Sequence, residues 1–380
     1  MHRLLLLALL AVCPTFAAQQ DPSPDPPAPA IAAKSYLLVD YNSGQQIVAQ
    51  DPQRRVDPAS LTKLMTAYVT FKALKEKRIR PGQVVPVSEQ AWRAEGSRMF
   101  IEPRKAVTVD ELIHGMIVQS GNDACIALAD AIAGSEDAFV ALMNREAQRL
   151  GLKNTRYVNT TGLPHSNHYS TAEDIAALAA AIIRDFPEHY PLYSQREYRY
   201  NNITQANRNR LLWIDPTVDG LKTGFTEAAG YCLVASARRG ERRLVSVVMG
   251  TQSDALRTSE TQKLLNFGFQ AYETRRVYAK GKPVADPEVY KGTQSRVPVG
   301  FLHDVWLTLP RGRFQGLEAV VRMRQPFVAP LAAGEKAGIM KLMRDNEPVA
   351  EFPVVALEDV PVAGFLSRGW DTLRLLAHSR

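Results

Sequence analysis

The chain has 380 residues, of which 46% are hydrophobic and 22% charged, and it carries a formal net charge of +7. This length allows two or three domains, and the composition is that of a globular protein, which excludes a largely disordered chain. Basic residues form no long run and no recognisable module accompanies them, so the sequence gives no indication of a nucleic-acid-binding protein.

The first residues have the pattern of a targeting segment. Arg3 precedes an unbroken apolar run from Leu4 to Val12, which is too short to span a bilayer, and Ala17 and Ala18 are small enough for cleavage. The pattern predicts a secretory signal peptide over residues 1–18. The Pro-rich stretch that follows, 19–32, cannot bury a core and predicts an extended linker.

Helical and strand patterns alternate over residues 33–280, which we expect to form one domain of the α+β class. Hydrophobic spacing predicts a helix that begins near Ser60, where Pro58 stands just upstream of the first turn. The remaining helices are predicted over 110–118, 123–132, 171–183 and 259–272. Strands are predicted over 36–39, 46–49, 230–237 and 244–249.

Short strand patterns dominate from residue 281 to residue 360 and predict a small all-β domain. They cover 305–309, 317–323, 339–343 and 349–357, with turn signals between them. Residues 361–380 have the pattern of an amphipathic helix, with Phe365, Trp370 and Leu373 on its apolar side. This pattern suits a helix at a membrane surface and equally a helix packed on the β domain.

Cysteines are too few for a disulfide scaffold. Once the signal peptide is removed, only Cys125 and Cys232 remain, and the sequence leaves open whether they pair, although buried free thiols fit better. No clustered His and Cys pattern is present. We therefore expect no metal site and no cofactor.

The first motif with chemical content is Ser60-Leu61-Thr62-Lys63. Residues three apart share one face of a helix, so Lys63 can reach the hydroxyl of Ser60. A serine needs a neighbouring base to become a nucleophile, and a lysine serves only when its pKa is depressed. Taken alone, this four-residue pattern is common enough to arise by chance.

Two further tripeptides make coincidence a poor explanation. Ser120-Gly121-Asn122 places a hydroxyl and an amide two residues apart, where they can relay a proton and hold a peptide carbonyl. Lys222-Thr223-Gly224 offers a cation and a hydroxyl for a carboxylate, beside a glycine that lets a substrate backbone approach. All three motifs occur in the same order as in one group of acyl-transfer enzymes.

The chain resembles the serine D-alanyl-D-alanine carboxypeptidases of the low-molecular-mass penicillin-binding protein 5/6 type. The resemblance covers nearly the whole mature chain and includes PASLTKLMTAYV, SGNDACIALAD and VDGLKTGFTEAAGYCLVASA. It implies a penicillin-binding or β-lactamase-like transpeptidase domain, with a central antiparallel sheet flanked by helices, followed by the small all-β domain. It also implies an exported, periplasmic enzyme, attached through its C-terminal helix to the outer face of the inner membrane.

The resemblance assigns roles to individual residues. Ser60 would attack the D-Ala-D-Ala bond of a peptidoglycan pentapeptide, Lys63 would be the general base, and Ser120 would pass a proton to the departing D-alanine. The substrate would be held by Asn122, Lys222, Thr223, Gly224, Phe225 and Arg257. Within this set, Thr223 and Arg257 would bind the terminal carboxylate, and the N–H groups of Ser60 and Phe225 would form the oxyanion hole. Arg208 is a weaker candidate.

Phe225 departs from the family pattern, since many relatives have His after the Lys-Thr-Gly motif. The backbone role of this position survives the change, whereas any side-chain role of the His in substrate choice or deacylation would be altered. No ExxLN-type stretch lies between the second and third motifs, which favours covalent inhibition by β-lactams over their destruction. A DD-endopeptidase, a weak β-lactamase and a silent wall-binding protein are the alternatives.

Overall fold

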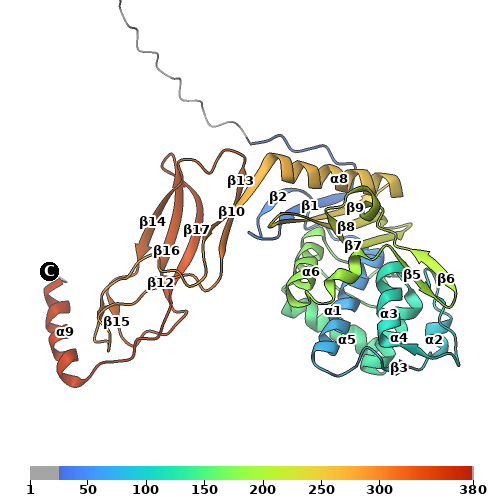
Figure 1. Ribbon diagram of the computed structural model, residues 1–380, viewed down its shortest axis with the longest axis horizontal. Coiled ribbons are helices and arrows are strands. Elements are labelled where there is room, and N and C mark those ends of the chain that lie inside the picture. The colour runs from blue at the N-terminus through green and yellow to red at the C-terminus, as the bar shows by residue number, and fades with distance from the viewer. Residues whose placement is uncertain (1–24, 379–380) are drawn as a thin grey trace, which may run out of the picture.

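The computed structural model describes residues 25–378, so the predicted signal peptide lies outside the described residues. Two bodies follow each other along the chain, a mixed α/β domain and a smaller β domain, and the C-terminal helix lies at the far end (Figure 1). The expected fold class is confirmed in both parts.

A five-stranded antiparallel sheet forms the centre of the first domain. Its strand order is β2-β1-β9-β8-β7, which places β7 at an edge. The bounds are β1 Ser35–Asp40, β2 Gln46–Gln50, β7 Val218–Thr226, β8 Gly230–Arg239 and β9 Arg242–Thr251. The predicted opening hairpin and the later pair of strands are therefore confirmed.

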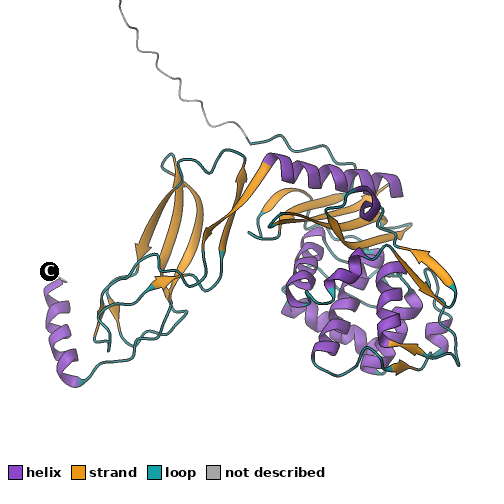
Figure 2. Ribbon diagram, in the orientation of Figure 1, coloured by secondary structure: helices purple, strands orange, loops and turns teal. Residues whose placement is uncertain are grey.

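Helices cover both faces of this sheet, as Figure 2 shows. Successive side chains of a strand point to opposite faces. Leu38 and Val248 accordingly pack with α8 (Asp254–Ala271) in one core cluster, whereas Leu37 and Val247 pack in another with α1 (Lys63–Lys75) and α6 (Ala172–Asp185). The sheet is thus the middle of three layers.

The remaining elements of this domain lie on the α1 side of the sheet, except for α7, whose Leu211 and Leu212 pack in the core cluster of α8. They are η1 Ala59–Thr62, β3 Val84–Val85, α2 Glu89–Trp92, β4 Val107–Thr108, α3 Val109–His114, η2 Gly115–Gln119, α4 Asn122–Ala133, α5 Glu136–Arg149, η3 Tyr190–Ser194, β5 Glu197–Tyr200, β6 Ile203–Ala206 and α7 Leu211–Ile214. The helix predicted over 110–118 is divided here, because its second half is a π-helical turn, η2.

The predicted start of the helix 259–272 is wrong. Helix α8 begins at Asp254, because the Ser253 hydroxyl accepts a hydrogen bond from the Leu256 N–H and caps the helix there. It ends at Ala271, and Tyr272 already belongs to a strand. The earlier start brings Arg257 into the first turn of the helix.

The second domain is all-β over the described residues 272–361. A four-stranded sheet has the order β12-β17-β16-β14, and two strand pairs, β10-β13 and β11-β15, complete the domain around its own core. The bounds are β10 Tyr272–Tyr278, β11 Val289–Tyr290, β12 Val299–Gly300, β13 Val305–Pro310, β14 Glu318–Met323, β15 Phe327–Val328, β16 Lys336–Arg344 and β17 Glu347–Ala356. Strand pairing thus groups residues 272–278, which precede the expected boundary at 281, with the β domain.

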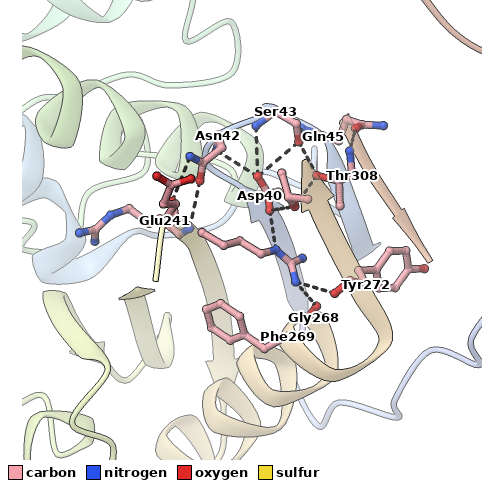
Figure 3. Close-up of polar contacts among 12 residues, drawn as sticks. Asp40, Asn42, Ser43, Gln45, Glu241, Gly268, Phe269, Tyr272 and Thr308 are labelled. Atoms are coloured by element: carbon pink, nitrogen blue, oxygen red, sulfur yellow. Dashed lines mark hydrogen bonds and ion pairs between the residues drawn. The ribbon is translucent and has the colours of Figure 1, made fainter. Parts of the chain in front are cut away.

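A buried polar network joins the two domains (Figure 3). The carboxylate of Asp40 is fully buried and accepts hydrogen bonds from Arg242 Nε at 2.9 Å and from the Thr274 hydroxyl of β10. Arg242 also donates to the carbonyls of Gly268 and Tyr272, where α8 passes into β10. The end of β1, the end of α8 and the start of the β domain therefore share one network.

The C-terminal helix α9 (Phe365–His378) is held to the β domain through its polar side. The Lys291 N–H donates to Asp371 at 2.6 Å, and Arg374 pairs with Glu288 at 2.5 Å. Phe365, Trp370 and Leu373 point away and are 81%, 67% and 61% exposed. Within residues 25–378, no helix is both long and apolar enough to cross a membrane.

Candidate active site

Ser60 lies in the short 3₁₀ turn η1, directly before α1. The preceding residue, Ala59, has a φ of +46°, a left-handed conformation that is uncommon outside glycine, and its N–H is held by Asp57 Oδ1 at 2.8 Å. Lys63 is the first residue of α1, and its Nζ lies 2.9 Å from Ser60 Oγ and 2.6 Å from the carbonyl oxygen of Thr161. The predicted approach of Lys63 to Ser60 is present.

The environment of Lys63 favours a neutral amine. The side chain is 1% exposed, and this burial lowers the pKa of Lys63 to about 8, with the positive charge of Arg208 acting in the same direction. Burial also lowers the pKa of Lys222 well below its ordinary value, and the charge of Lys63 adds to that effect. A lysine with a pKa near neutrality can take a proton from a hydroxyl.

Ser120 and Asn122 belong to the junction between η2 and α4. Ser120 has a φ of +68°, and its Oγ accepts a hydrogen bond from Lys222 Nζ at 2.9 Å. Asn122 Nδ2 donates to the Glu95 carbonyl at 2.6 Å, while its Oδ1 is buried and has no hydrogen-bond partner among the described residues. The side-chain amide oxygen of Asn122, Oδ1, is thus available to accept a hydrogen bond from a bound molecule.

Strand β7 brings the third motif beside Ser60 because it is an edge strand with η1 as its neighbour. A Cβ at Gly224 would lie 3.1 Å from the Pro58 carbonyl oxygen and 3.2 Å from the Ser60 nitrogen, so a side chain here would push these backbone atoms away by a few tenths of an ångström. Gly224 therefore sets the spacing between the backbone of β7 and the backbone of the serine.

Phe225 and Arg257 meet around Tyr231. The rings of Phe225 and Tyr231 lie 4.2 Å apart, and the Arg257 guanidinium lies 5.4 Å from the centre of the Tyr231 ring. Arg257 Nη1 donates to the Gly224 carbonyl at 3.2 Å, and the guanidinium pairs with Asp254. Phe225 itself is 44% exposed. Phe225 therefore places an apolar surface at the cleft directly after the Lys-Thr-Gly motif.

One cleft of about 820 Å³ collects these residues. Its lining includes the predicted Ser60, Ser120, Asn122, Thr223, Gly224, Phe225 and Arg257, together with the weaker candidate Arg208. Lys63 and Lys222 lie buried beneath it, each bonded to a serine that lines it. All the predicted site residues therefore gather in one place.

Other lining residues were not predicted from the sequence. Ser97, Thr161 and Gly162 come from segments that carry no motif, and only the fold brings them to the cleft. Tyr231 and Asp254 line it as well, and Tyr231 belongs to the stretch VDGLKTGFTEAAGYCLVASA that carries the resemblance. The position of Asp254 could have been predicted in part, because Ser253 just before it is a typical helix N-cap residue and marks the start of α8.

Neither a disulfide nor a metal cluster is present in the part of the chain that the structure describes. Cys125 and Cys232 are both free and buried. Burial raises the pKa of Cys125 to about 12 and that of Cys232 to about 11, so both are inert thiols at neutral pH. Residues 25–378 hold no group of three or more His, Cys, Asp or Glu side chains suited to a metal ion.

Comparison with known proteins identifies both domains. Residues 20–253 match the family model described as D-alanyl-D-alanine carboxypeptidase, and residues 272–362 match the model of the C-terminal domain of penicillin-binding protein 5. The chain is 42% identical to the D-alanyl-D-alanine carboxypeptidase DacA of Escherichia coli K12 over 361 residues, which are 93% of this chain and 90% of that protein.

A second relative and a solved structure support the same family assignment. The carboxypeptidase DacC of Escherichia coli K12 is 40% identical over 97% of this chain and 94% of its own length. The crystal structure of penicillin-binding protein 5 from Haemophilus influenzae superposes with a TM-score of 0.85 at 41% identity, covering 88% of this chain and 99% of that one. The chain therefore belongs to the D-alanyl-D-alanine carboxypeptidase family of serine hydrolases.

Proposed function

We propose that this protein removes the terminal D-alanine from peptidoglycan pentapeptide stems through an acyl-enzyme on Ser60. The observation that carries the proposal is the pairing of two serines with two buried lysines on one cleft, Ser60 with Lys63 and Ser120 with Lys222, each pair at 2.9 Å. A neutral lysine against a serine hydroxyl is the arrangement that acyl transfer needs.

In the proposed reaction, Ser60 Oγ attacks the carbonyl carbon of the D-Ala-D-Ala bond while its proton passes to Lys63. The negative charge on the carbonyl oxygen is stabilised by the N–H groups of Ser60 and Phe225. The C–N bond then breaks, and the leaving D-alanine nitrogen receives a proton through Ser120. Water finally hydrolyses the ester, which releases the shortened stem and restores Ser60.

Substrate recognition follows from the charges and polar groups of the cleft. The terminal carboxylate binds at Thr223 and Arg257, where a hydroxyl and a guanidinium face the cleft beside Gly224. Asn122 holds the stem peptide and Lys222 orients Ser120. β-Lactams acylate Ser60 in the same way, and water hydrolyses the resulting ester only slowly, so they act as covalent inhibitors.

The proposed location is the periplasmic face of the inner membrane, reached by cleavage of the signal peptide at 1–18. The support for peripheral attachment is the exposed row of Phe365, Trp370 and Leu373 on α9, which has the side chains of an interfacial helix.

Release of D-alanine from a pentapeptide, measured beside a cross-linked muropeptide, tests the activity. A carboxypeptidase acts on the first substrate, whereas cleavage of the cross-link alone would assign the enzyme as a DD-endopeptidase. A fluorescent penicillin should label the wild type and leave Ser60→Ala unlabelled. Equal label on both proteins, or none on the wild type, would refute the enzyme and favour a wall-binding protein.

A further inference from the structure

The loop from Glu95 to Ile101 forms a wall of the cleft without being a helix or a strand. Gly96 and Ser97 line the cleft directly. Two residues of the loop have left-handed backbones, Gly96 with a φ of +80° and Phe100 with a φ of +69°. Such a segment keeps its shape only when surrounding contacts hold it.

Asp123 supplies most of these contacts. Its side chain is fully buried at the start of α4, and Oδ1 accepts the N–H of Met99 at 2.9 Å. Oδ2 accepts the N–H of Phe100 at 2.8 Å and that of Ile101 at 3.2 Å. A fourth hydrogen bond, from the N–H of Ala124 to Oδ1, orients the carboxylate on its own helix. Three consecutive backbone donors of the loop therefore converge on one anion.

The neighbouring residue holds the other end of the loop. The N–H of Asn122 donates to the Ser97 carbonyl at 2.6 Å, and its Nδ2 donates to the Glu95 carbonyl at 2.6 Å. These bonds use the backbone N–H and one of the two side-chain N–H groups of Asn122, whereas Oδ1 has no partner among the described residues. The orientation of the Asn122 amide thus depends on the position of the loop, and Asp123 fixes that position.

We propose that Asp123 is a positioning residue for substrate binding: its carboxylate pins residues 99–101 and thereby holds the cleft wall and the Asn122 amide in place. Asp123 does not line the cleft, so it acts through the loop and through Asn122. The inference rests on the proposed function, because the cleft wall matters only if a peptide binds there.

Asp123 also provides negative charge close to the catalytic lysine. The charges and titratable groups that face Lys63 are Lys222 from β7, Asp123 and Cys125 from α4, Arg208, and His168. Among them, Cys125 and, to a lesser degree, Asp123 raise the pKa of Lys63 and so oppose the effect of burial. Its positional and electrostatic effects can be separated by changing shape and charge independently.

Amide hydrogen exchange on the wild-type protein tests the positional effect without a variant. The amides of Met99 and Phe100 should exchange at least a hundredfold more slowly than freely exposed amides. Exchange at the exposed rate would overturn the proposal. This measurement does not depend on catalysis, so it remains informative even if the wild type releases no D-alanine and the proposed function fails.

Two substitutions then link the loop to the reaction. Asp123→Glu keeps the charge but moves the carboxylate, and Asp123→Asn removes the charge and places an amide donor against backbone donors. Both should raise KM for a diacetyl-Lys-D-Ala-D-Ala peptide about tenfold, with a smaller change in kcat. Only Asp123→Asn should also move the acidic limb of the kcat/KM profile to lower pH. Asp137→Asn, the same change at an exposed position of α5, is the control.

The KM values of the two variants distinguish a positional role of Asp123 from a purely electrostatic one. Variants that fold and keep KM within twofold of the wild type would overturn the proposal. A raised KM in Asp123→Asn alone would assign the effect to charge and would overturn the positional role. If both variants fail to fold, the exchange rates of the wild-type amides decide.

Discussion

Lys222 Nζ lies 2.9 Å from Ser120 Oγ, the same distance at which Lys63 Nζ lies from Ser60 Oγ. Each serine of the cleft is therefore hydrogen-bonded to its own lysine. Both lysines are buried, and burial is the main cause that lowers the pKa of each. The positive charge of Lys63 adds to the effect of burial at Lys222 and further disfavours protonation of Lys222. The cleft thus keeps a lysine base available near neutral pH.

The pKa of Lys63 predicts the pH dependence of acylation. A lysine accepts a proton only in its neutral form, and the neutral fraction rises as the pH increases through about 8. The second-order rate constant for acylation by benzylpenicillin should therefore rise about tenfold per unit below that pH and level off above it. Stopped-flow measurements between pH 6 and 10 check this expectation.

Lys63→Arg is the control for that profile, because a guanidinium stays protonated over the whole range. Acylation by this variant should be at least a thousandfold slower at every pH. A wild-type rate that is flat or falls between pH 6 and 8 would contradict the assignment of Lys63 as the base.

Gly224 is predicted to tolerate no side chain. The Cβ of Gly224→Ala would lie 3.1 Å from the Pro58 carbonyl oxygen and 3.2 Å from the Ser60 nitrogen, so β7 and η1 must move apart. Because this movement displaces the N–H groups proposed as the oxyanion hole, acylation by a penicillin should slow by at least about tenfold.

The matched control is the next residue. Phe225→Ala removes an exposed ring and leaves the backbone N–H in place, so acylation should change by less than about threefold. Phe225→His tests the departure from the family pattern, since it restores the side chain found in many relatives. An equal loss in Gly224→Ala and Phe225→Ala would show that backbone spacing is not the controlling factor.

The ion pair of Asp40 with Arg242 is predicted to stabilise the junction of the domains. Asp40→Ala leaves the guanidinium buried without its carboxylate, and breaking a buried pair in this way costs about 3–5 kcal/mol. Denaturant unfolding measures the loss, and Glu241→Gln, an exposed neighbour, should have almost no effect. Unchanged stability of Asp40→Ala would contradict a role for the network shown in Figure 3.

Local patterns predicted much of this structure. Alternation and helical spacing identified the opening hairpin, the strands β8 and β9, and the helices around the first two motifs, because each of these signals is contained in a few neighbouring residues. The approach of Lys63 to Ser60 was predictable for the same reason, since one helical turn separates them.

Contacts between distant segments were not predictable in this way. Thr161 reaches Lys63 from 98 residues away, and Asp123 holds residues 99–101 through backbone N–H groups that leave no trace in the sequence. The pairing of β10 with β13 escaped prediction as well, because paired residues such as Arg276 and Trp306 lie far apart in the sequence.

The exposed face of α9 gives the last prediction, which concerns the membrane. Trp370 and Leu373 are 67% and 61% exposed, whereas the polar side chains of Asp371 and Arg374 contact the β domain. Full burial of one large apolar side chain contributes roughly 1.5–3 kcal/mol. Trp370→Glu should therefore reduce binding to vesicles of phosphatidylethanolamine and phosphatidylglycerol by about tenfold or more.

Thr372→Glu is the matched control, because it introduces the same charge two residues away, on a different side of the helix. It should bind vesicles far better than Trp370→Glu, and both variants should release D-alanine from a soluble peptide at the wild-type rate. Co-sedimentation with the vesicles measures the binding. Equal vesicle binding by wild type and Trp370→Glu would contradict membrane attachment through the exposed face of α9. The helix would then be a structural part of the β domain, to which Asp371 and Arg374 hold it.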